Sequence, residues 1–156
     1  MNSIANFAAL NPGYHFPEFE IETDMLFKAK QLGHPLIKEE QKVCNNFQVD
    51  AEQDLFLITG SNMAGKSTFL RTVGVNLCLA FAGAPVNADA LHTRLFRLFT
   101  SINVKDSLEG GLSHFYAEVR RLRRLLEELE KETELPLFFF VDEIFKGTNN
   151  RERYQG

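Results

Sequence analysis

The sequence contains no tryptophan and only two cysteines, Cys44 and Cys78, among its 156 residues. The two cysteines lie far apart, without a Cys-x-x-Cys pair or a neighbouring histidine cluster, which argues against a zinc site and against a disulfide framework. No apolar run approaches the roughly 18 residues of a membrane span, and the N-terminus has no signal-peptide pattern. We therefore expect a cytoplasmic protein with reduced thiols and no membrane partner.

The chain also has no excess of basic residues, since its formal net charge is −4. Charged residues make up 24% of the chain and hydrophobic residues 44%, which is ordinary for a soluble globular domain with a core of its own. A net negative charge argues against this segment being the main surface that binds DNA. Any DNA contact would then belong to an attached domain.

Expected strands and helices alternate along the chain. The segments are a short helix at 2–10, short strands at 34–37 and 42–49, a strand at Asp54–Thr59, a helix from Lys66 to near Gly83, a strand at Arg94–Ile102, a helix at His114–Glu132 with Ser113 as its N-cap, and a strand at Leu137–Val141. This alternation predicts a parallel, three-layered α/β sheet.

A phosphate-binding motif lies between the strand at Asp54–Thr59 and the helix that follows. Residues 60–67 read GSNMAGKS and match G-x-x-x-x-G-K-[ST], in which glycines let backbone N–H groups point at phosphate oxygens. Lys66 is expected to reach the β- and γ-phosphates, and Ser67 to hold Mg²⁺. The full predicted nucleotide-binding set is Gly60, Ser61, Asn62, Met63, Ala64, Gly65, Lys66, Ser67 and Thr68. The motif predicts binding of ATP or ADP with Mg²⁺.

A second apolar strand runs directly into two adjacent carboxylates, Asp142 and Glu143. In P-loop enzymes an acid at this place supports Mg²⁺, often through water, and Asp142 fits that role as a metal ligand. Glu143 suits the general base that activates the attacking water, which makes it a catalytic candidate together with Lys66. Two surface acids that cap a strand are the alternative interpretation.

A glycine pair followed by Ser113 at an expected helix N-terminus indicates a second anion-binding nest. Its place between the two motifs above matches the signature of ABC-type ATPases, which contacts the γ-phosphate bound to the opposite subunit. Ser113 is therefore a third catalytic candidate. An ordinary capped helix remains the alternative.

Together these residues resemble the ATPase domain of the MutS family of DNA mismatch-repair proteins. The stretch ITGSNMAGKSTFLRTVG is similar to that family's P-loop and helix, DSLEGGLSHFYAE to its signature region, and VDEIFKGT to its Walker B strand and following turn. The resemblance runs from about His34 to Arg151. It implies a three-layer P-loop NTPase fold of the ABC type with a mostly parallel sheet, C-terminally incomplete after the Walker B region.

Some positions depart from the family's pattern. Ser61 stands where the family usually has proline, and His114 where it has threonine, so the signature's hydroxyl role falls to Ser113 alone. The position of the family's adenine-stacking aromatic falls near Lys42 and Val43, which leaves the base contacts open. These departures bear on mismatch recognition more than on ATP chemistry.

The resemblance also implies a domain organisation and a function. Residues 1–33 would be a lead-in segment, the end of a lever helix and a linker, and residues 34–156 an ATPase domain incomplete at its C-terminus. ATP binding and hydrolysis would switch a DNA-sensing homodimer whose DNA is held by domains absent from this chain, and the isolated fragment would hydrolyse ATP weakly or not at all. The alternatives are the ATPase head of another ABC-type DNA-repair or chromosome-maintenance protein, and a non-catalytic nucleotide-binding module.

Overall fold

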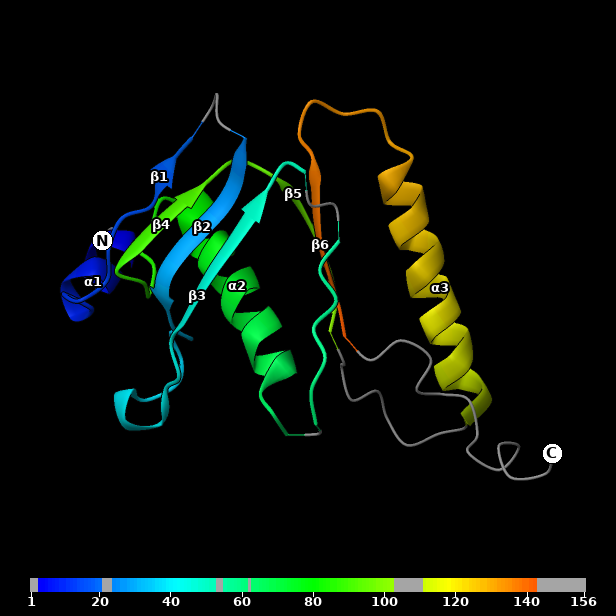
Figure 1. The fold of residues 1–156 in the computed structure, drawn as a ribbon, viewed down its shortest axis with the longest axis horizontal. Coiled ribbons are helices and arrows are strands. Elements are labelled where there is room, and N and C mark those ends of the chain that lie inside the picture. Colours follow the sequence, from blue (N-terminus) through cyan, green and yellow to red (C-terminus); the bar gives the residue numbers. More distant parts are fainter. Residues whose placement is uncertain (1–2, 21–23, 53–54, 62, 103–110, 143–156) are drawn as a thin grey trace. The chain divides into compact units, whose positions relative to one another are not determined.

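The computed structural model describes residues 3–20, 24–52, 55–61, 63–102 and 111–142, with the backbone alone at 111–115. Contacts divide the chain into an N-terminal unit, Met1–Leu95, and a C-terminal unit, Phe96–Gly156. The N-terminal unit contains helix α1 (Ser3–Leu10), strands β1 (Glu18–Phe19) and β2 (Met25–Leu32), a 3₁₀ turn (Glu39–Gln41), strand β3 (Asn45–Asp50), helix α2 (Lys66–Phe81) and strand β4 (Ala90–Thr93). The C-terminal unit contains strand β5 (Arg97–Ser101), helix α3 (Gly111–Leu129) and strand β6 (Leu137–Val141) (Figure 1).

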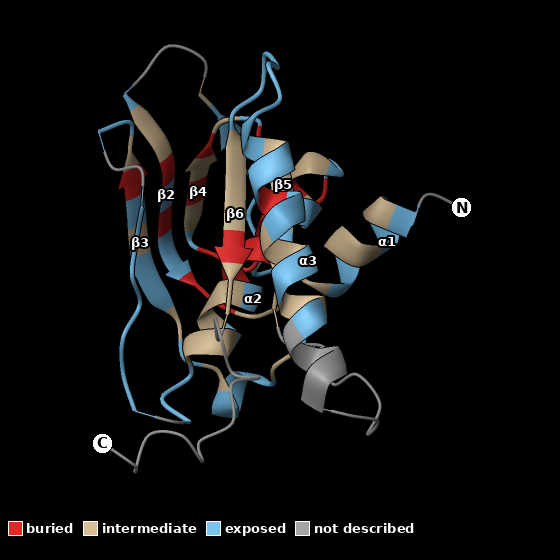
Figure 2. Ribbon diagram, turned by 90° about the vertical axis from the view of Figure 1, so that its right-hand side faces the viewer, coloured by how far each residue is buried: buried red, intermediate tan, exposed pale blue. Residues whose placement is uncertain are grey.

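The sheet of the N-terminal unit has the strand order β1-β4-β2-β3, with β1 parallel to β4 and the other pairs antiparallel. Along β2, Phe27 and Ala29 are buried while Lys28 is exposed, so the two faces of the sheet differ in polarity. Helix α2 runs along the apolar face (Figure 1), where the rings of Phe47 and Phe69 meet at 5.2 Å between centroids. Figure 2 shows the buried positions of β2 and β4 that form this core.

Helix α2 ends at a glycine, as the sequence predicts. Gly83 adopts a left-handed backbone conformation with φ of 73°, and its N–H donates to the carbonyl oxygen of Ala80 at 2.9 Å. The N–H of Ala84 donates to the carbonyl oxygen of Leu79 at 2.9 Å. These two bonds form a Schellman motif, which satisfies carbonyl groups that the last helical turn leaves without partners.

In the C-terminal unit, β5 and β6 pair in parallel, from Arg97 opposite Leu137 to Ser101 opposite Val141. Arg97 links this pair to α3, because its Nη1 lies 2.9 Å from the carboxylate of Glu128 and its Nη2 donates to the Glu128 carbonyl oxygen at 2.9 Å. A guanidinium that bonds both a side chain and the backbone fixes the end of the helix more firmly than a single ion pair.

Several expected elements are confirmed. Helix α1 lies within 2–10, α2 and β6 match their predicted ranges, β5 lies within Arg94–Ile102, and β3 covers the second half of 42–49 and one residue more. The α/β class is confirmed too. The described strands, however, form a mixed four-stranded sheet and a two-stranded parallel sheet, instead of one mostly parallel sheet.

Three local predictions are wrong. Residues 34–37 form a turn, since Pro35 and the hydrogen bond from the N–H of Ile37 to the carbonyl oxygen of His34 bend the chain. Residues 55–61 form no strand, because none of the described strands pairs with them, and apolar composition alone does not make a β-ladder. Ser113 is not an N-cap, because α3 begins two residues earlier, at Gly111.

Within the described ranges, none of the helices combines the length and the apolar character that a crossing of the bilayer requires.

Candidate functional site

The glycine-rich loop before α2 closes around the side chain of Lys66. The ammonium nitrogen of Lys66 donates to the carbonyl oxygens of Gly60 at 2.8 Å and Ser61 at 2.7 Å. The N–H of Ala64 donates to the carbonyl oxygen of Ser61 at 3.2 Å, which tightens the same loop. An ammonium group has three donors, so this arrangement leaves one of them for a ligand. Asn62, a predicted member of the site, lies outside the described residues.

The N-cap residue of α2 has no side chain that could cap the helix. This residue is Gly65, in the left-handed conformation with φ of 86°, and it makes no side-chain bond to the N–H groups that follow. The N–H groups of a first turn have no partner within the helix, and the helix dipole adds partial positive charge there. The N-terminus of α2, with Ser67 and Thr68 in its first turn, is thus built to receive an anion.

A cavity of about 450 Å³ opens beside this loop within the N-terminal unit. Its lining comes from the loop and α2 on one side and from the β2–β3 connection on the other: Ile58, Thr59, Ala64, Gly65, Lys66, Thr68, Phe69 and Thr72, and His34, Ile37, Gln41, Lys42, Val43 and Asn45. The volume falls in the range of small-molecule sites. The loop side suits an anionic group, and the opposite side combines polar side chains with the apolar residues Ile37 and Val43.

A buried asparagine joins the two sides of the cavity. Asn76 on α2 is 0% exposed, and its Nδ2 donates to the carbonyl oxygens of Gly33 at 3.0 Å and Thr72 at 2.8 Å. Its Oδ1 accepts from the N–H of Asn87 at 2.8 Å. The N–H of Gly33 in turn donates to the carbonyl oxygen of Asn87 at 2.8 Å. This network places the start of the β2–β3 connection against α2.

Lys42 belongs to the same wall of the cavity. Its side chain is 5% exposed, and its ammonium group forms an ion pair with Glu39 and donates to Oδ1 of Asn87 at 3.3 Å. A Cβ atom at Gly33 would meet Cδ of Lys42 at 2.7 Å, so glycine is required there to admit the lysine stem. Lys42 and Val43, where the sequence suggests the contact with a base, both line the cavity.

His34 also lines the cavity, and its pKa is lowered, first by burial and second by the positive charge of Arg71. Its Nδ1 accepts a hydrogen bond from the N–H of Leu36 at 3.2 Å, which requires that nitrogen to be unprotonated. The imidazole therefore presents a neutral surface to a ligand at neutral pH.

The carboxylate of Asp142 lies at the end of β6, in the C-terminal unit. Its N–H donates to the carbonyl oxygen of Ser101 at 3.0 Å, which continues the β5–β6 ladder by one residue. Its Oδ2 is buried and has no hydrogen-bond partner within the described part of the chain. A buried carboxylate oxygen without a donor is costly, and a cation is one group that would satisfy it.

Two predicted catalytic groups are not described. Glu143 and the side chain of Ser113 lie outside the residues whose placement the structure gives. The sequence analysis in turn missed Asn76, Asn87 and Glu118. The Oε2 atom of Glu118 is buried and has no hydrogen-bond partner among the described residues. The signal for Asn76 was an amide between Val73 and Leu77 on the apolar face of a helix.

The profile of the family described as MutS domain V matches residues 56–155. The chain is similar to the DNA mismatch repair protein MutS of Chlorobaculum tepidum, with 36% identity over 143 residues, 88% of this chain and 16% of that protein. It is 30% identical over 150 residues to the protein of the same name from Ehrlichia ruminantium, covering 95% of this chain and 18% of that protein. It thus spans less than a fifth of these relatives.

Proposed function

Because the chain belongs to the family described as MutS domain V, we propose that it is an ATP-binding and ATP-hydrolysing domain of a MutS-like DNA mismatch-repair protein. The observation that carries this proposal is the uncapped first turn of α2, with Lys66 folded into the loop before it and the cavity beside it. The relatives it matches are named as mismatch repair proteins. The fold would be completed as a three-layer P-loop NTPase, with residues 34–156 as the ATPase domain and residues 1–33 as a lead-in.

Different residues contact the phosphates and the base of the nucleotide. The N–H groups of the loop and of the first turn of α2 hold the phosphates, and the third donor of Lys66 contacts the β- and γ-phosphates. The base lies in the part of the cavity lined by Ile37, Lys42 and Val43, where the aliphatic stem of Lys42 is fixed by its bonds to Glu39 and Asn87.

Ser67 and Asp142 are the residues that would hold Mg²⁺. The hydroxyl of Ser67 stands in the first turn of α2, and the orphaned Oδ2 of Asp142 is a hard oxygen ligand of the kind that Mg²⁺ prefers. Each of these oxygens, taken by itself, is of the type that Mg²⁺ binds, and this chemistry supports the assignment. Bound there, the ion would neutralise charge on the phosphate oxygens.

Two further residues take part in ATP hydrolysis. Glu143 accepts a proton from the attacking water, and Ser113 donates to the γ-phosphate held by a second copy of the domain. The functional unit is therefore a homodimer. DNA is bound by parts of the protein outside this chain, in line with its net charge of −4.

A thermal-shift titration tests nucleotide binding. Mg-ATP at a hundredfold excess over Kd should stabilise the chain by about 2.7 kcal/mol. Lys66→Ala should lose this gain, because it removes the ammonium group from the loop. Lys30→Ala is the matched control, since Lys30 lies on the exposed face of β2 and contributes nothing to the cavity, and it should respond as wild type does. An equal response of Lys66→Ala and wild type would contradict the site.

Phosphate release separates hydrolysis from binding alone. In the full-length protein, Glu143→Gln should retain ATP binding and lose most phosphate release, because the amide keeps the shape of the side chain and removes the base. A non-catalytic nucleotide-binding module would instead bind ATP and release no phosphate even as wild type.

A mixing experiment tests the dimer. Ser113→Ala and Lys66→Ala variants of the full-length protein should each be inactive alone, and the heterodimer should regain up to one working site, since one chain supplies Lys66 and the other Ser113. No recovery in verified heterodimers would favour an ordinary structural role for Ser113.

A further inference from the structure

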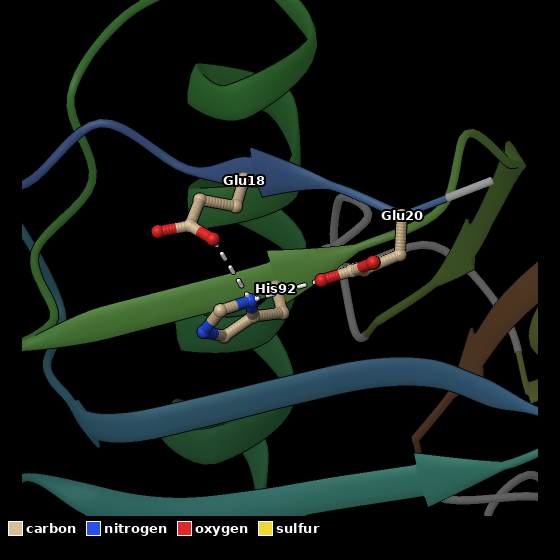
Figure 3. A group of neighbouring side chains, drawn as sticks. All are labelled: Glu18, Glu20 and His92. Atoms are coloured by element: carbon tan, nitrogen blue, oxygen red, sulfur yellow. Dashed lines mark hydrogen bonds and ion pairs between the residues drawn. The ribbon is translucent and has the colours of Figure 1, made fainter. Parts of the chain in front are cut away.

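Three potential metal ligands meet on the sheet face opposite α2. Glu18 on β1, Glu20 just after β1, and His92 on β4 point toward one another (Figure 3). Nδ1 of His92 lies 3.5 Å from Oε2 of Glu18 and 3.3 Å from Oε1 of Glu20. One ligand atom from each of the three side chains lies within 4.8 Å of the other two.

Sheet register produces this cluster. In the parallel β1–β4 pair, Glu18 is opposite His92 and Phe19 opposite Thr93. The N–H of Glu20 donates to the carbonyl oxygen of Thr93 at 3.0 Å, which extends the pairing. Residues two apart on an extended strand share a face, so the two glutamates lie on either side of the imidazole. The cluster is therefore set by backbone pairing between segments more than 70 residues apart.

We propose that Glu18, Glu20 and His92 form a binding site for a divalent transition-metal ion of the zinc type. Ligands at about 2.0–2.1 Å from a tetrahedral ion are about 3.3 Å apart, and both nitrogen-to-oxygen separations are close to this value. A small rotation of Glu18, whose side chain is 74% exposed, brings the third ligand into place. Water completes the coordination sphere.

The ligand types select the metal. One imidazole nitrogen with two carboxylate oxygens suits Zn²⁺, Mn²⁺, Fe²⁺ or Co²⁺, whereas Mg²⁺ and Ca²⁺ prefer oxygen ligands alone. The side chains of His92 and Glu20 are 30% and 33% exposed, so an ion can enter from solvent while part of the site is shielded.

Charge at the cluster also favours a divalent ion. Two carboxylates so close together repel each other, and a dication cancels both charges. Lys28 on β2 is paired with His92 on β4 and lies on the same face of the sheet, yet among the described residues it forms no ion pair with either glutamate. Lys28 thus leaves the pair of carboxylates for another cation.

This site is independent of the nucleotide function. None of its three residues lines the cavity beside the P-loop. A failure of ATP to bind would therefore not contradict the metal site, and a failure of the metal to bind would not contradict the nucleotide site.

Isothermal titration of the full chain with Zn²⁺, under reducing conditions and without nucleotide, tests the proposal. Wild type should bind one ion at this site. His92→Ala and Glu20→Gln should each weaken that binding by at least about tenfold. Even the loss of a residue that only hydrogen-bonds a metal ligand typically lowers metal affinity by about tenfold or more. Glu127→Gln, a matched change at an exposed residue of α3, should bind as wild type does. Co²⁺ should give visible absorption in wild type that His92→Ala lacks.

Several outcomes would overturn the proposal. Zn²⁺ binding that is equal in wild type, His92→Ala and Glu20→Gln would place the ion elsewhere, with Cys44 and Cys78 as the first candidates. No binding in wild type would leave the cluster as a histidine shared by two carboxylates. Circular dichroism of His92→Ala and Glu20→Gln controls for folding, and Glu18→Gln, a change at the most exposed of the three, gives a variant that keeps the fold.

Discussion

The ammonium nitrogen of Lys66 lies 2.8 Å from the carbonyl oxygen of Gly60, a residue six positions earlier that begins the same loop. This bond and the bond to the carbonyl oxygen of Ser61 tie the side chain of Lys66 to the backbone of the loop. Preorganised donors lose less entropy when a ligand binds. The conformation of the loop therefore contributes to affinity, apart from the side chains it carries.

Gly65→Ala should separate loop conformation from side-chain chemistry. No atom lies within 4 Å of a Cβ built at Gly65, so the cost of alanine comes from its φ of 86°, about 1–2 kcal/mol. ATP affinity should fall roughly tenfold if the loop absorbs that strain. Gly83→Ala is the control, since Gly83 has φ of 73° at the other end of α2 and equally open space. It should cost the same stability in urea unfolding and leave ATP affinity unchanged.

Asn76→Ala should destabilise the protein by roughly 2–4 kcal/mol, because it leaves buried partners at Gly33 and Asn87 without a hydrogen bond and opens a small void. Denaturant unfolding measures the change. Asn45→Ala, at an exposed position of β3, should stay within about 0.5 kcal/mol of wild type. A neutral Asn76→Ala would mean that water replaces the amide.

Asp142→Asn should weaken the effect of Mg²⁺ on nucleotide binding. The orphaned Oδ2 loses its charge, so the difference in stabilisation by ATP between Mg²⁺ and chelator should be smaller in this variant than in wild type. Thermal shift in the two buffers measures this. Asp50→Asn, whose carboxylate accepts from Gln48 far from the loop, should keep the response of wild type. An undiminished Mg²⁺ effect in Asp142→Asn would remove Asp142 from the metal site.

Glu128 should make the free energy of unfolding depend on pH. Its pKa lies below the ordinary value of 4.5, first because Lys131 donates a hydrogen bond to it and then because of the charges of Lys131 and Arg97. A carboxyl group whose pKa is lowered by folding stabilises the native state above its unfolded pKa, and that contribution is lost as the pH falls through the native pKa. Glu128→Gln should therefore lose less stability than wild type on acidification from about pH 5 to pH 3.

Unfolding temperatures across this pH range measure the difference. Glu132→Gln, a matched change at an exposed residue that follows α3, is the control and should behave as wild type does. Parallel curves for wild type and Glu128→Gln would show that the contacts of Glu128 contribute nothing.

Features specified by neighbouring residues were predictable. The helix from Lys66, its end at Gly83 and the strand Leu137–Val141 all depend on local glycine positions or on a short apolar run. Strand β2 also carried a local signal, since MLFKAKQL alternates apolar and polar residues, although the sequence analysis did not use it.

What the sequence determined by itself was the glycine-rich loop with the helix that follows it, because a glycine-rich turn before an apolar helix encodes its geometry in consecutive residues. Only the tertiary structure decided which apolar runs are strands, since Leu55 and Leu57 stand exposed and none of the strands in the described part of the chain pairs with them. It also decided the cavity wall and the meeting of Glu18 with His92. Those features depend on pairing between distant segments. Strand register is a joint property of two segments of the backbone, and neither segment specifies it alone.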